Sequence, residues 1–304
     1  MNFDLSEDQV ALRDGIRSLC AGRFGRARVR AGFDRGVWSE LAETGVFSAR
    51  ADGFGWADVS IMFQELGRAL VPGPLTWSHL AHGVVDGIVG GVDRPAPDQP
   101  VFLEHRDAVD IVVILDDDGL EAVARDSLAD AEALDWPLDP LTPVHRAATL
   151  PTGERVGDAG AARAWRLGGA LLTAAYQVGM AQACADQATA YSLDRRQFGR
   201  PVGSFQAVKH LLADMAVRAE VARAGVDAAA CVLDDPETGD AARAVSGAKV
   251  LAGDAALENA KGSLQVHGGM GFTWELDVHL YLKRAWLLNT SFGSPAAHAE
   301  ALAS

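Results

Sequence analysis

The sequence is poor in cysteine, which limits the kinds of site it can build. Cys20, Cys184 and Cys231 are the only three cysteines among 304 residues. They are odd in number, far apart and embedded in helical patterns, which fits neither a disulfide framework nor a zinc ligand set. We interpret them as buried thiols in a reducing compartment and expect no metal site.

Basic residues are also scarce, and long apolar runs are missing. The chain has 27 Lys and Arg against 41 Asp and Glu, a formal net charge of −14. Bulk charge therefore disfavours binding to nucleic acid or to an anionic membrane. Charged residues interrupt every apolar run before the roughly 18 residues of a membrane span, and MNFDLSEDQV lacks the pattern of a signal peptide. We expect a cytoplasmic protein in which any anionic ligand needs a local basic site.

Helical patterns fill the first third of the chain. Ser6 and Gln9 form a capping-box pattern that predicts the start of a first helix. Amphipathic spacing predicts further helices over 37–43, 58–70 and 77–89. These segments form an N-terminal helical block.

The middle of the chain has the residue pattern of short strands. The proline-rich break VDRPAPDQP precedes a β-branched run over 109–115, which ends in an acidic turn. Further short strands are predicted over 120–123 and 147–150, between prolines. We predict a small β insert over residues 95–158.

Long helical patterns return after the insert. They cover 161–193, 204–233, 240–267 and 277–288, and three of them exceed the usual helix length of about 8–20 residues. Their faces are rich in Ala and Gly, which lets helix axes approach closely in a bundle. The predicted fold is mostly α, with an N-terminal helical domain (1–94), a β domain (95–158) and a C-terminal four-helix bundle (159–304).

The link between the first two long helices is a candidate anion site. It reads Arg195-Arg196-Gln197-Phe198-Gly199-Arg200, with three guanidiniums in six residues. Guanidiniums are permanently charged, bidentate donors to phosphate. The alternative is that they only complement the macrodipole at a helix C-terminus. The spacing favours neither reading.

The third long helix stops at a glycine cluster. In QVHGGMG, Gly268 and Gly269 follow Gln265 and His267, and such glycines let the backbone come close to a ligand. A simple glycine C-cap explains the same pattern. A structural role is the preferred reading for His267, because no second histidine lies at metal spacing nearby.

The order of domains, together with YSLDRRQFGRPVGSFQAVKHLLADM and QVHGGMGFTWELDVHLYLKRA, resembles acyl-CoA dehydrogenases over nearly the whole chain. In that family the two segments contact the pyrophosphate and adenine of an FAD held mainly by the neighbouring subunit. The resemblance therefore implies FAD as cofactor. The positions that it assigns to FAD binding are Arg195, Gln197, Phe198, Gln265, Gly268 and Gly269.

Other family features are missing. The β domain is short by about half, hence truncated, and contains no match to the Thr-Glu-Pro-x-x-Gly-Ser-Asp-like segment that holds the flavin ring. The position of the usual catalytic glutamate aligns with Phe292, and the alternative base position aligns near Gly169. Neither side chain accepts a proton. After Lys283 the only acid is Glu300, and Glu275 reads as a structural acid. The sequence thus assigns no catalytic residue to this chain.

The simplest interpretation is a subunit of a heteromeric acyl-CoA dehydrogenase, in the form of a heterotetramer. A homologous partner subunit then supplies the flavin-ring pocket, the catalytic glutamate and most of the acyl-CoA site. Steroid-derived thioesters are candidate substrates, because two-gene members of the family act on them. One alternative is a non-enzymatic helical scaffold that has lost flavin binding. Another is a self-sufficient homo-oligomer with an unusual base.

Overall fold

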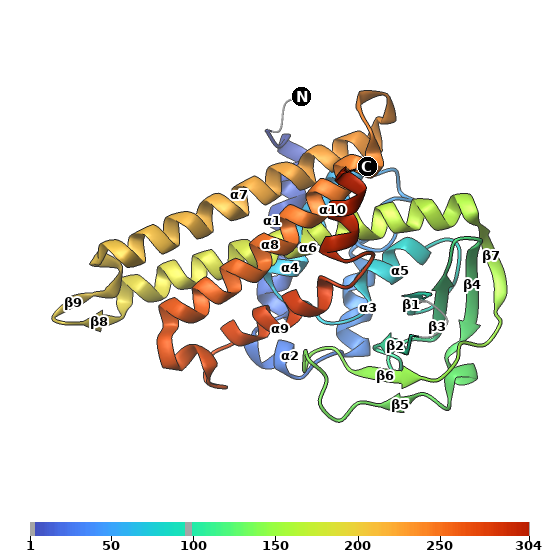
Figure 1. Ribbon diagram of the computed structural model, residues 1–304, viewed down its shortest axis with the longest axis horizontal. Helices are drawn as coiled ribbons and strands as arrows, with labels where there is room; N and C mark the ends of the chain where they lie inside the picture. The colour runs from blue at the N-terminus through green and yellow to red at the C-terminus, as the bar shows by residue number, and fades with distance from the viewer. Residues whose placement is uncertain (1–3, 95–98, 304) are drawn as a thin grey trace. The chain divides into compact units, whose positions relative to one another are not determined.

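The computed structural model describes residues 4–94 and 99–303, and helices dominate it (Figure 1). The predicted mostly α fold is confirmed, while the proline-rich break at 95–98 lies outside the described residues. Among the described helices, none combines the length and apolar character needed to cross a membrane. The chain divides into two compact units. The first contains Met1–Arg26, Gly55–Val71 and Ala170–Ser304, and the second contains Ala27–Phe54 and Pro72–Gly169.

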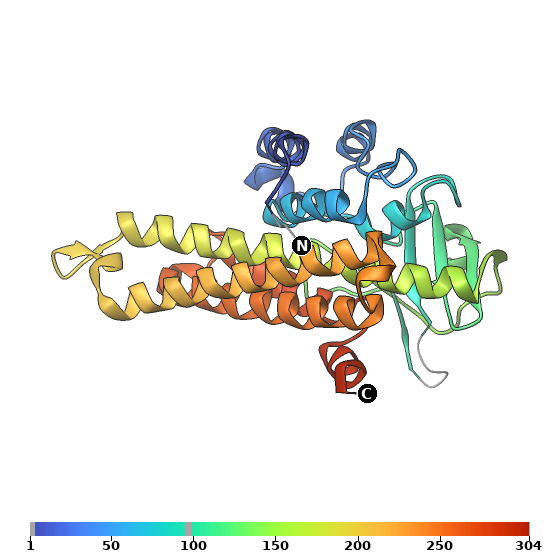
Figure 2. The ribbon, with the colours of Figure 1, turned by 90° about the horizontal axis from the view of Figure 1, so that it is seen from above.

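The first unit is built on the predicted four-helix bundle. Its long helices run side by side, and consecutive ones are antiparallel (Figures 1 and 2). The helices are α6 (Ala159–Asp194, in this unit from Ala170), α7 (Gln206–Asp234), α8 (Ala241–His267) and α9 (Val278–Leu288). Small buried residues such as Ala219, Ala222 and Ala256 line the packed faces, which explains the close approach of the axes. The four predicted helices are confirmed to within two residues at their ends.

Helices α1 (Glu7–Arg23) and α4 (Trp56–Arg68) complete the core of this unit. The predicted capping box between Ser6 and Gln9 is confirmed. Gly55, at the N-cap of α4, has no side chain to cap the helix. Asp234, the last residue of α7, replaces it by accepting hydrogen bonds from the backbone N–H groups of Trp56 (2.7 Å) and Ala57 (3.0 Å). A residue distant in sequence thus satisfies the free donors at this helix start.

Two glycines let α4 and α6 cross backbone to backbone. A Cβ atom on Gly179 would lie 2.7 Å from the carbonyl carbon of Gln64 and 2.8 Å from the nitrogen of Arg68. A Cβ atom on Gly67 would lie 2.8 Å from the Cα atom of Tyr176. Neither helix can carry a side chain at the crossing, so glycine is required twice.

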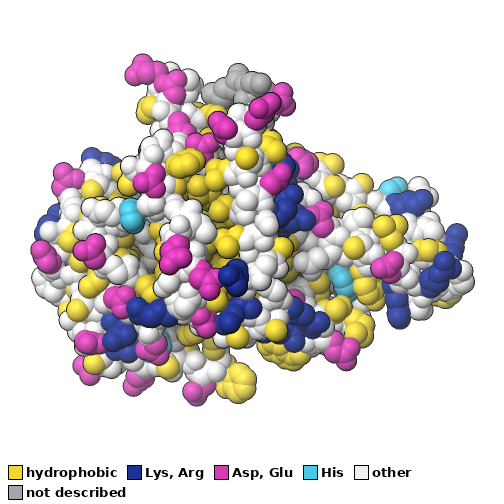
Figure 3. Space-filling model, turned by 180° about the vertical axis from the view of Figure 1, so that it is seen from behind, with side chains coloured by type: hydrophobic (Ala, Val, Ile, Leu, Met, Phe, Trp, Pro, Cys, Tyr) yellow, Lys and Arg dark blue, Asp and Glu magenta, His cyan; other side chains and the backbone are white. Residues whose placement is uncertain are grey.

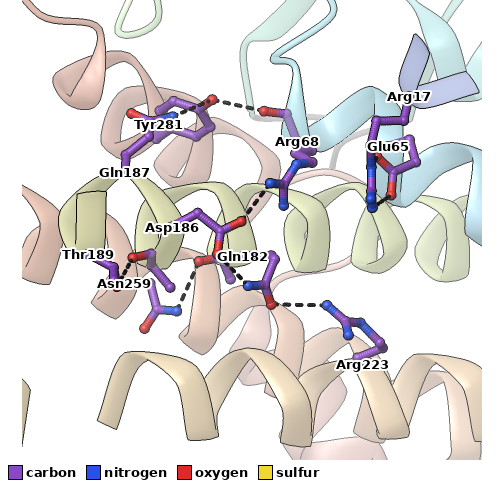
Figure 4. Close-up of polar contacts among 12 residues, drawn as sticks. Arg17, Glu65, Arg68, Gln182, Asp186, Gln187, Thr189, Arg223, Asn259 and Tyr281 are labelled. Carbon is purple, nitrogen blue, oxygen red and sulfur yellow. Dashed lines mark hydrogen bonds and ion pairs between the residues drawn. The ribbon is translucent and has the colours of Figure 1, made fainter. Parts of the chain in front are cut away.

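Ion pairs and amide contacts surround this crossing (Figure 4). Arg17 of α1 makes a bidentate pair with the buried carboxylate of Glu65 at 2.9 and 2.7 Å. Arg68 of α4 pairs with Asp186 of α6 at 2.6 Å. The bidentate geometry of the Arg17–Glu65 pair restricts the rotation of α1 and α4 about their axes, and the Arg68–Asp186 pair links α4 to α6.

The second unit carries two small sheets. One has the strand order β1-β3-β4-β7, with β1 parallel to β3 and the other pairs antiparallel, and the other has the order β2-β6-β5. Leu115, Leu120 and Trp165 share the core of the first sheet. The strands are β1 (Val89–Asp93), β2 (Val101–Glu104), β3 (Ile111–Leu115), β4 (Gly119–Ala124), β5 (Glu132–Ala133), β6 (Val144–Ala147) and β7 (Glu154–Asp158). The helices are α3 (Arg35–Glu43) and α5 (Leu75–Ala81), with α2 (Arg26–Arg30) at the limit between the units.

Several predicted elements need correction. The helix predicted over 77–89 is wrong beyond Ala81, because Gly83 and Gly87 take positive φ values of 79° and 101° and a strand starts at Val89. The strand predicted over 147–150 is wrong, since β6 ends at Ala147. Helix α10 (Pro295–Ala303) and strands β2 and β7 had not been predicted.

Candidate functional site

The arginine-rich link folds as a tight hairpin. Strand β8 (Arg196–Gln197) pairs with β9 (Arg200–Pro201) across a two-residue loop. The loop residues Phe198 and Gly199 have φ values of 52° and 78°, as a type I′ turn requires. Glycine adopts this conformation freely, whereas a bulky residue such as Phe198 is rarely found there. A strained phenylalanine at a loop tip suggests a functional role for its ring.

Aromatic contacts stiffen the hairpin. The ring of Phe198 is 92% exposed but meets the ring of Phe205 edge-on, with centroids 6.1 Å apart. The guanidinium of Arg200 lies 4.1 Å from the centroid of the same Phe205 ring, which is a cation–π contact. The base of the hairpin is held by the backbone, where Arg195 N–H donates to the Tyr191 carbonyl oxygen at 2.9 Å. These contacts restrain the side chains of Phe198 and Arg200 at the hairpin.

The three guanidiniums of the hairpin are available to an anion. Arg195, Arg196 and Arg200 are all exposed, and no carboxylate of the described residues forms an ion pair with them. Lys and Arg side chains gather at this end of the bundle (Figure 3). Since Arg196 and Arg200 lie on strands beyond the end of α6, the geometry favours anion binding over a role limited to the helix end.

The glycine cluster forms the second segment. Helix α8 ends at His267, Gly268 adopts φ 60°, and a 3₁₀ turn, η4 (Gly268–Phe272), follows. Gly268 and Gly269 are exposed, and nothing lies within 4 Å of the place where a Cβ atom would stand. Gln265 is exposed one turn earlier. The backbone of this turn can therefore be approached closely by a ligand.

Both segments lie at the same end of the bundle. The hairpin joins the end of α6 to the start of α7, and α8 runs back to that end (Figure 2). The rings of Tyr191 in α6 and His267 in α8 are in contact, with centroids 4.2 Å apart. The structure thus brings together the six positions that the sequence singled out for the cofactor: Arg195, Gln197, Phe198, Gln265, Gly268 and Gly269.

Exposed apolar side chains accompany these segments, which the sequence had not indicated. Phe272, the last residue of η4, is 73% exposed, Trp274 two residues later is 59% exposed, and Leu193 is exposed before the hairpin. Clustered exposed aromatics mark ligand or protein contacts. Guanidiniums, open backbone and aromatic rings fit an anionic ligand that also carries an aromatic ring.

The positions expected for a catalytic base are apolar. Phe292 is buried in the turn after α9, with φ 52°. Its carbonyl oxygen accepts a hydrogen bond from His298 Nε2 at 2.9 Å, and His298 Nδ1 meets the Ser246 hydroxyl at 3.1 Å. Both ring nitrogens are thus occupied, and burial lowers the pKa of His298. This imidazole is therefore held neutral and offers no nitrogen to a substrate proton.

The alternative base position, Gly169, is buried within α6 and has no side chain. The two acids that the sequence left to consider are exposed. Glu300 is exposed on α10. Glu275 is exposed too, and its backbone carbonyl accepts a hydrogen bond from Arg26. Neither carboxylate is enclosed in a cleft, as a general base is expected to be.

One buried cation was not foreseen. Lys249 of α8 is fully buried, and its Nζ donates to the Leu288 carbonyl oxygen at 2.9 Å. Burial lowers its pKa to about 8. A cation at the carbonyl end of α9 is a favourable helix C-cap, so Lys249 holds the turn that carries Phe292.

A cavity of about 360 Å³ opens among α1, α4 and α7. Arg13, Glu65 and Asp227 contribute to its walls. Burial raises the pKa of Asp227 to about 6, while a hydrogen bond from Gln64 Nε2 at 3.3 Å opposes the rise. Asp227 lies roughly 30 Å along α7 from the hairpin, at 1.5 Å per residue. The cavity is therefore separate from the two segments described above.

Comparison with known proteins gives consistent matches. Residues 167–304 match the family described as acyl-CoA dehydrogenase, C-terminal domain. The acyl-CoA dehydrogenase IpdE2 of Mycobacterium tuberculosis is 35% identical over 305 residues, which covers 92% of this chain and 91% of that protein. In the ChsE4–ChsE5 complex from Mycobacterium tuberculosis, a chain superposes with a TM-score of 0.85 at 21% identity, covering 100% of this chain and 98% of the other. A variant of the steroid ACAD Tcur3481–Tcur3483 superposes with a TM-score of 0.83 at 21% identity, covering 98% and 97%. The two solved structures show a shared fold.

Proposed function

Because the chain belongs to the acyl-CoA dehydrogenase family, we propose that it is a subunit of a heteromeric FAD-dependent enzyme that contributes half of the flavin site. One observation carries the proposal. The two segments to which the family resemblance assigns pyrophosphate and adenine binding lie together at one end of the bundle, whereas the positions that it assigns to a proton acceptor hold Phe292 and, nearby, Gly169. The reaction is the α,β-dehydrogenation of an acyl-CoA thioester (EC 1.3).

FAD, when bound, supplies the chemistry of the family by accepting a hydride from the substrate. The residues of this chain bind and orient it. Arg195 neutralises the diphosphate together with its two neighbouring guanidiniums. The Gln197 and Gln265 amides and the backbone of Gly268 and Gly269 offer hydrogen bonds.

The exposed Phe198 ring gives a face against which an aromatic ring can stack. When a ligand ring covers Phe198, the two rings together keep water away from the adjacent guanidiniums, which strengthens the electrostatic attraction between the guanidiniums and phosphate.

The remaining parts of the active site belong to a homologous partner subunit in this proposal. That partner supplies the flavin-ring pocket, the catalytic glutamate and most of the acyl-CoA site, in a heterotetramer. The solved relative ChsE4–ChsE5 is described as a complex of two proteins, which supports a two-chain assembly. Tcur3481–Tcur3483 is described as a steroid ACAD, so a steroid-derived CoA thioester is the first substrate to assay.

The first experiment is the visible absorption spectrum of this chain purified alone and after co-expression with a candidate homologous dehydrogenase subunit. We expect a colourless chain and a yellow complex that oxidises an acyl-CoA. Flavin bound by the chain alone, with activity, would contradict the division of the site. A complex without flavin would indicate a helical scaffold.

Arg195→Ala tests the anion site within the complex. Loss of a charge-assisted hydrogen bond to phosphate corresponds to about 10- to 150-fold weaker FAD binding. Arg243→Ala is the matched control, because Arg243 is also exposed but lies at the start of α8, the opposite end of the bundle. Equal FAD affinity in both variants would refute the assignment of the hairpin.

A further inference from the structure

An aromatic pair connects the hairpin end of α6 to the glycine-turn end of α8. Tyr191 lies in the last turn of α6, and His267 is the last residue of α8. Their ring centroids are 4.2 Å apart and the planes are inclined by 32°. Such pairs stabilise by more than the area they bury.

Each ring is tied to the backbone of one segment. The Tyr191 carbonyl oxygen accepts the backbone hydrogen bond of Arg195 at 2.9 Å, so a shift of Tyr191 moves the first arginine of the hairpin. The Arg195 carbonyl in turn accepts from Val202 N–H at 2.8 Å, which closes the base of the hairpin.

The histidine is held equally firmly. His267 is buried, and its Nδ1 meets the Ser263 carbonyl oxygen at 2.7 Å, which requires a proton on Nδ1. Gly271 folds back against it, since a Cβ atom on Gly271 would lie 3.3 Å from the His267 Cβ atom. The position of His267 therefore sets the position of the glycine turn.

We infer that Tyr191 and His267 are positioning residues that hold the hairpin and the glycine turn at the spacing required to bind one FAD. The inference rests on the proposed function and extends it. Neither ring needs to touch the cofactor, because each acts through the backbone of the segment beside it. Loss of the stack lets the two halves of the site move independently, which lowers cofactor affinity even where the fold persists.

The test is the dissociation constant of FAD for the apo complex of this chain with its partner subunit, measured by flavin fluorescence. Tyr191→Leu removes the ring and is expected to weaken binding by about 2- to 12-fold, the range measured for aromatic pairs. The conservative variant Tyr191→Phe keeps the ring and is expected to restore the wild-type constant. If Tyr191→Leu does not assemble, Tyr191→Met fills the same space without a planar ring and carries the same expectation.

Thermal unfolding of the same apo complexes separates positioning from simple stability. A lower melting temperature with an unchanged FAD constant at 20 °C would overturn the inference. A double variant, Tyr191→Leu with His267→Leu, is expected to bind FAD no more weakly than the single variant with the larger loss of affinity, because the pair acts as one unit. Additive losses of affinity would also overturn the inference. If wild-type complex binds no FAD, or Arg195→Ala binds it normally, the proposed function itself fails. If only the Tyr191 variants bind normally, the inference alone fails.

Discussion

Replacing Gly179 with alanine tests the crossing of α4 and α6. At an open helix position, Gly→Ala raises stability by about 0.5–1 kcal/mol. At Gly179 the new methyl would overlap the Gln64 carbonyl oxygen and would lie 2.7 Å from the Gln64 carbonyl carbon, against an ordinary contact of 3.4 Å or more, so the helices must separate by more than 0.7 Å there. A gap of 0.5–1 Å forfeits about a quarter to a half of each dispersion contact along the crossing.

We expect Gly179→Ala to lower the free energy of unfolding by about 1–3 kcal/mol, as overpacked cores do. The control is Gly247→Ala in α8, where nothing lies within 4 Å of the added methyl. That variant should gain up to about 1 kcal/mol. The two substitutions are chemically identical and differ only in their surroundings.

Urea unfolding followed by circular dichroism measures both effects. In thermal unfolding, each 1 kcal/mol corresponds to about 2–4 °C for a unit of this size. Equal shifts for the two variants, in either direction, would refute the close backbone crossing.

Three further substitutions test other contacts. Asp227→Asn should be more stable than wild type at pH 7, by up to about 3 kcal/mol. Burial raises the pKa of Asp227 to about 6, so the folded wild type must ionise a buried carboxyl and loses stability as the pH rises from 4 to 6. Urea midpoints of both proteins at pH 4 and 7 check this, and a pH-independent difference would contradict it. Between pH 8 and 10, the free energy of unfolding of wild type should rise by about 2–3 kcal/mol relative to that of Lys249→Met. The reason is that the pKa of Lys249 is lowered to about 8 in the folded protein, so wild type gains stability as the pH rises. Parallel pH profiles of unfolding for the two proteins would count against this. Asp234→Ala should cost about 0.5–2 kcal/mol, since it uncaps Trp56 and Ala57, and unchanged hydrogen exchange at the start of α4 would exclude this role.

The long helices were predictable because their pattern is local. Apolar spacing placed α8 within one residue of its observed limits, 241–267. Strand β1 was missed because its two central glycines, Gly90 and Gly91, hide the β pattern. A Cβ atom on Gly91 would lie 2.6 Å from a ring carbon of Trp77, so the glycine serves packing against α5. Tertiary packing overrides local propensity there.

The parts of the candidate site were readable from the sequence, but their geometry was not. The guanidiniums and glycines are visible as motifs, whereas their shared location depends on the antiparallel course of α7 and α8. The contact between Tyr191 and His267 has no sequence signal, because it joins residues from separate helices. Lys249 was likewise invisible, since only the fold shows that a lysine in an alanine-rich helix is fully buried.

The division of the first unit into three separate segments has a consequence for synthesis. A nascent chain that has emerged as far as Gly169 contains every segment of the second unit, but the first unit still lacks its last 135 residues, 170–304. At 5–20 residues per second their synthesis takes about 7–27 s. During that interval α1 can pack against α4, but α4 still lacks the residues of α6 and α7 that cover it, and the cap that Asp234 gives to Trp56 lies 178 residues downstream. We expect this interval to be the period in which the protein most needs a chaperone.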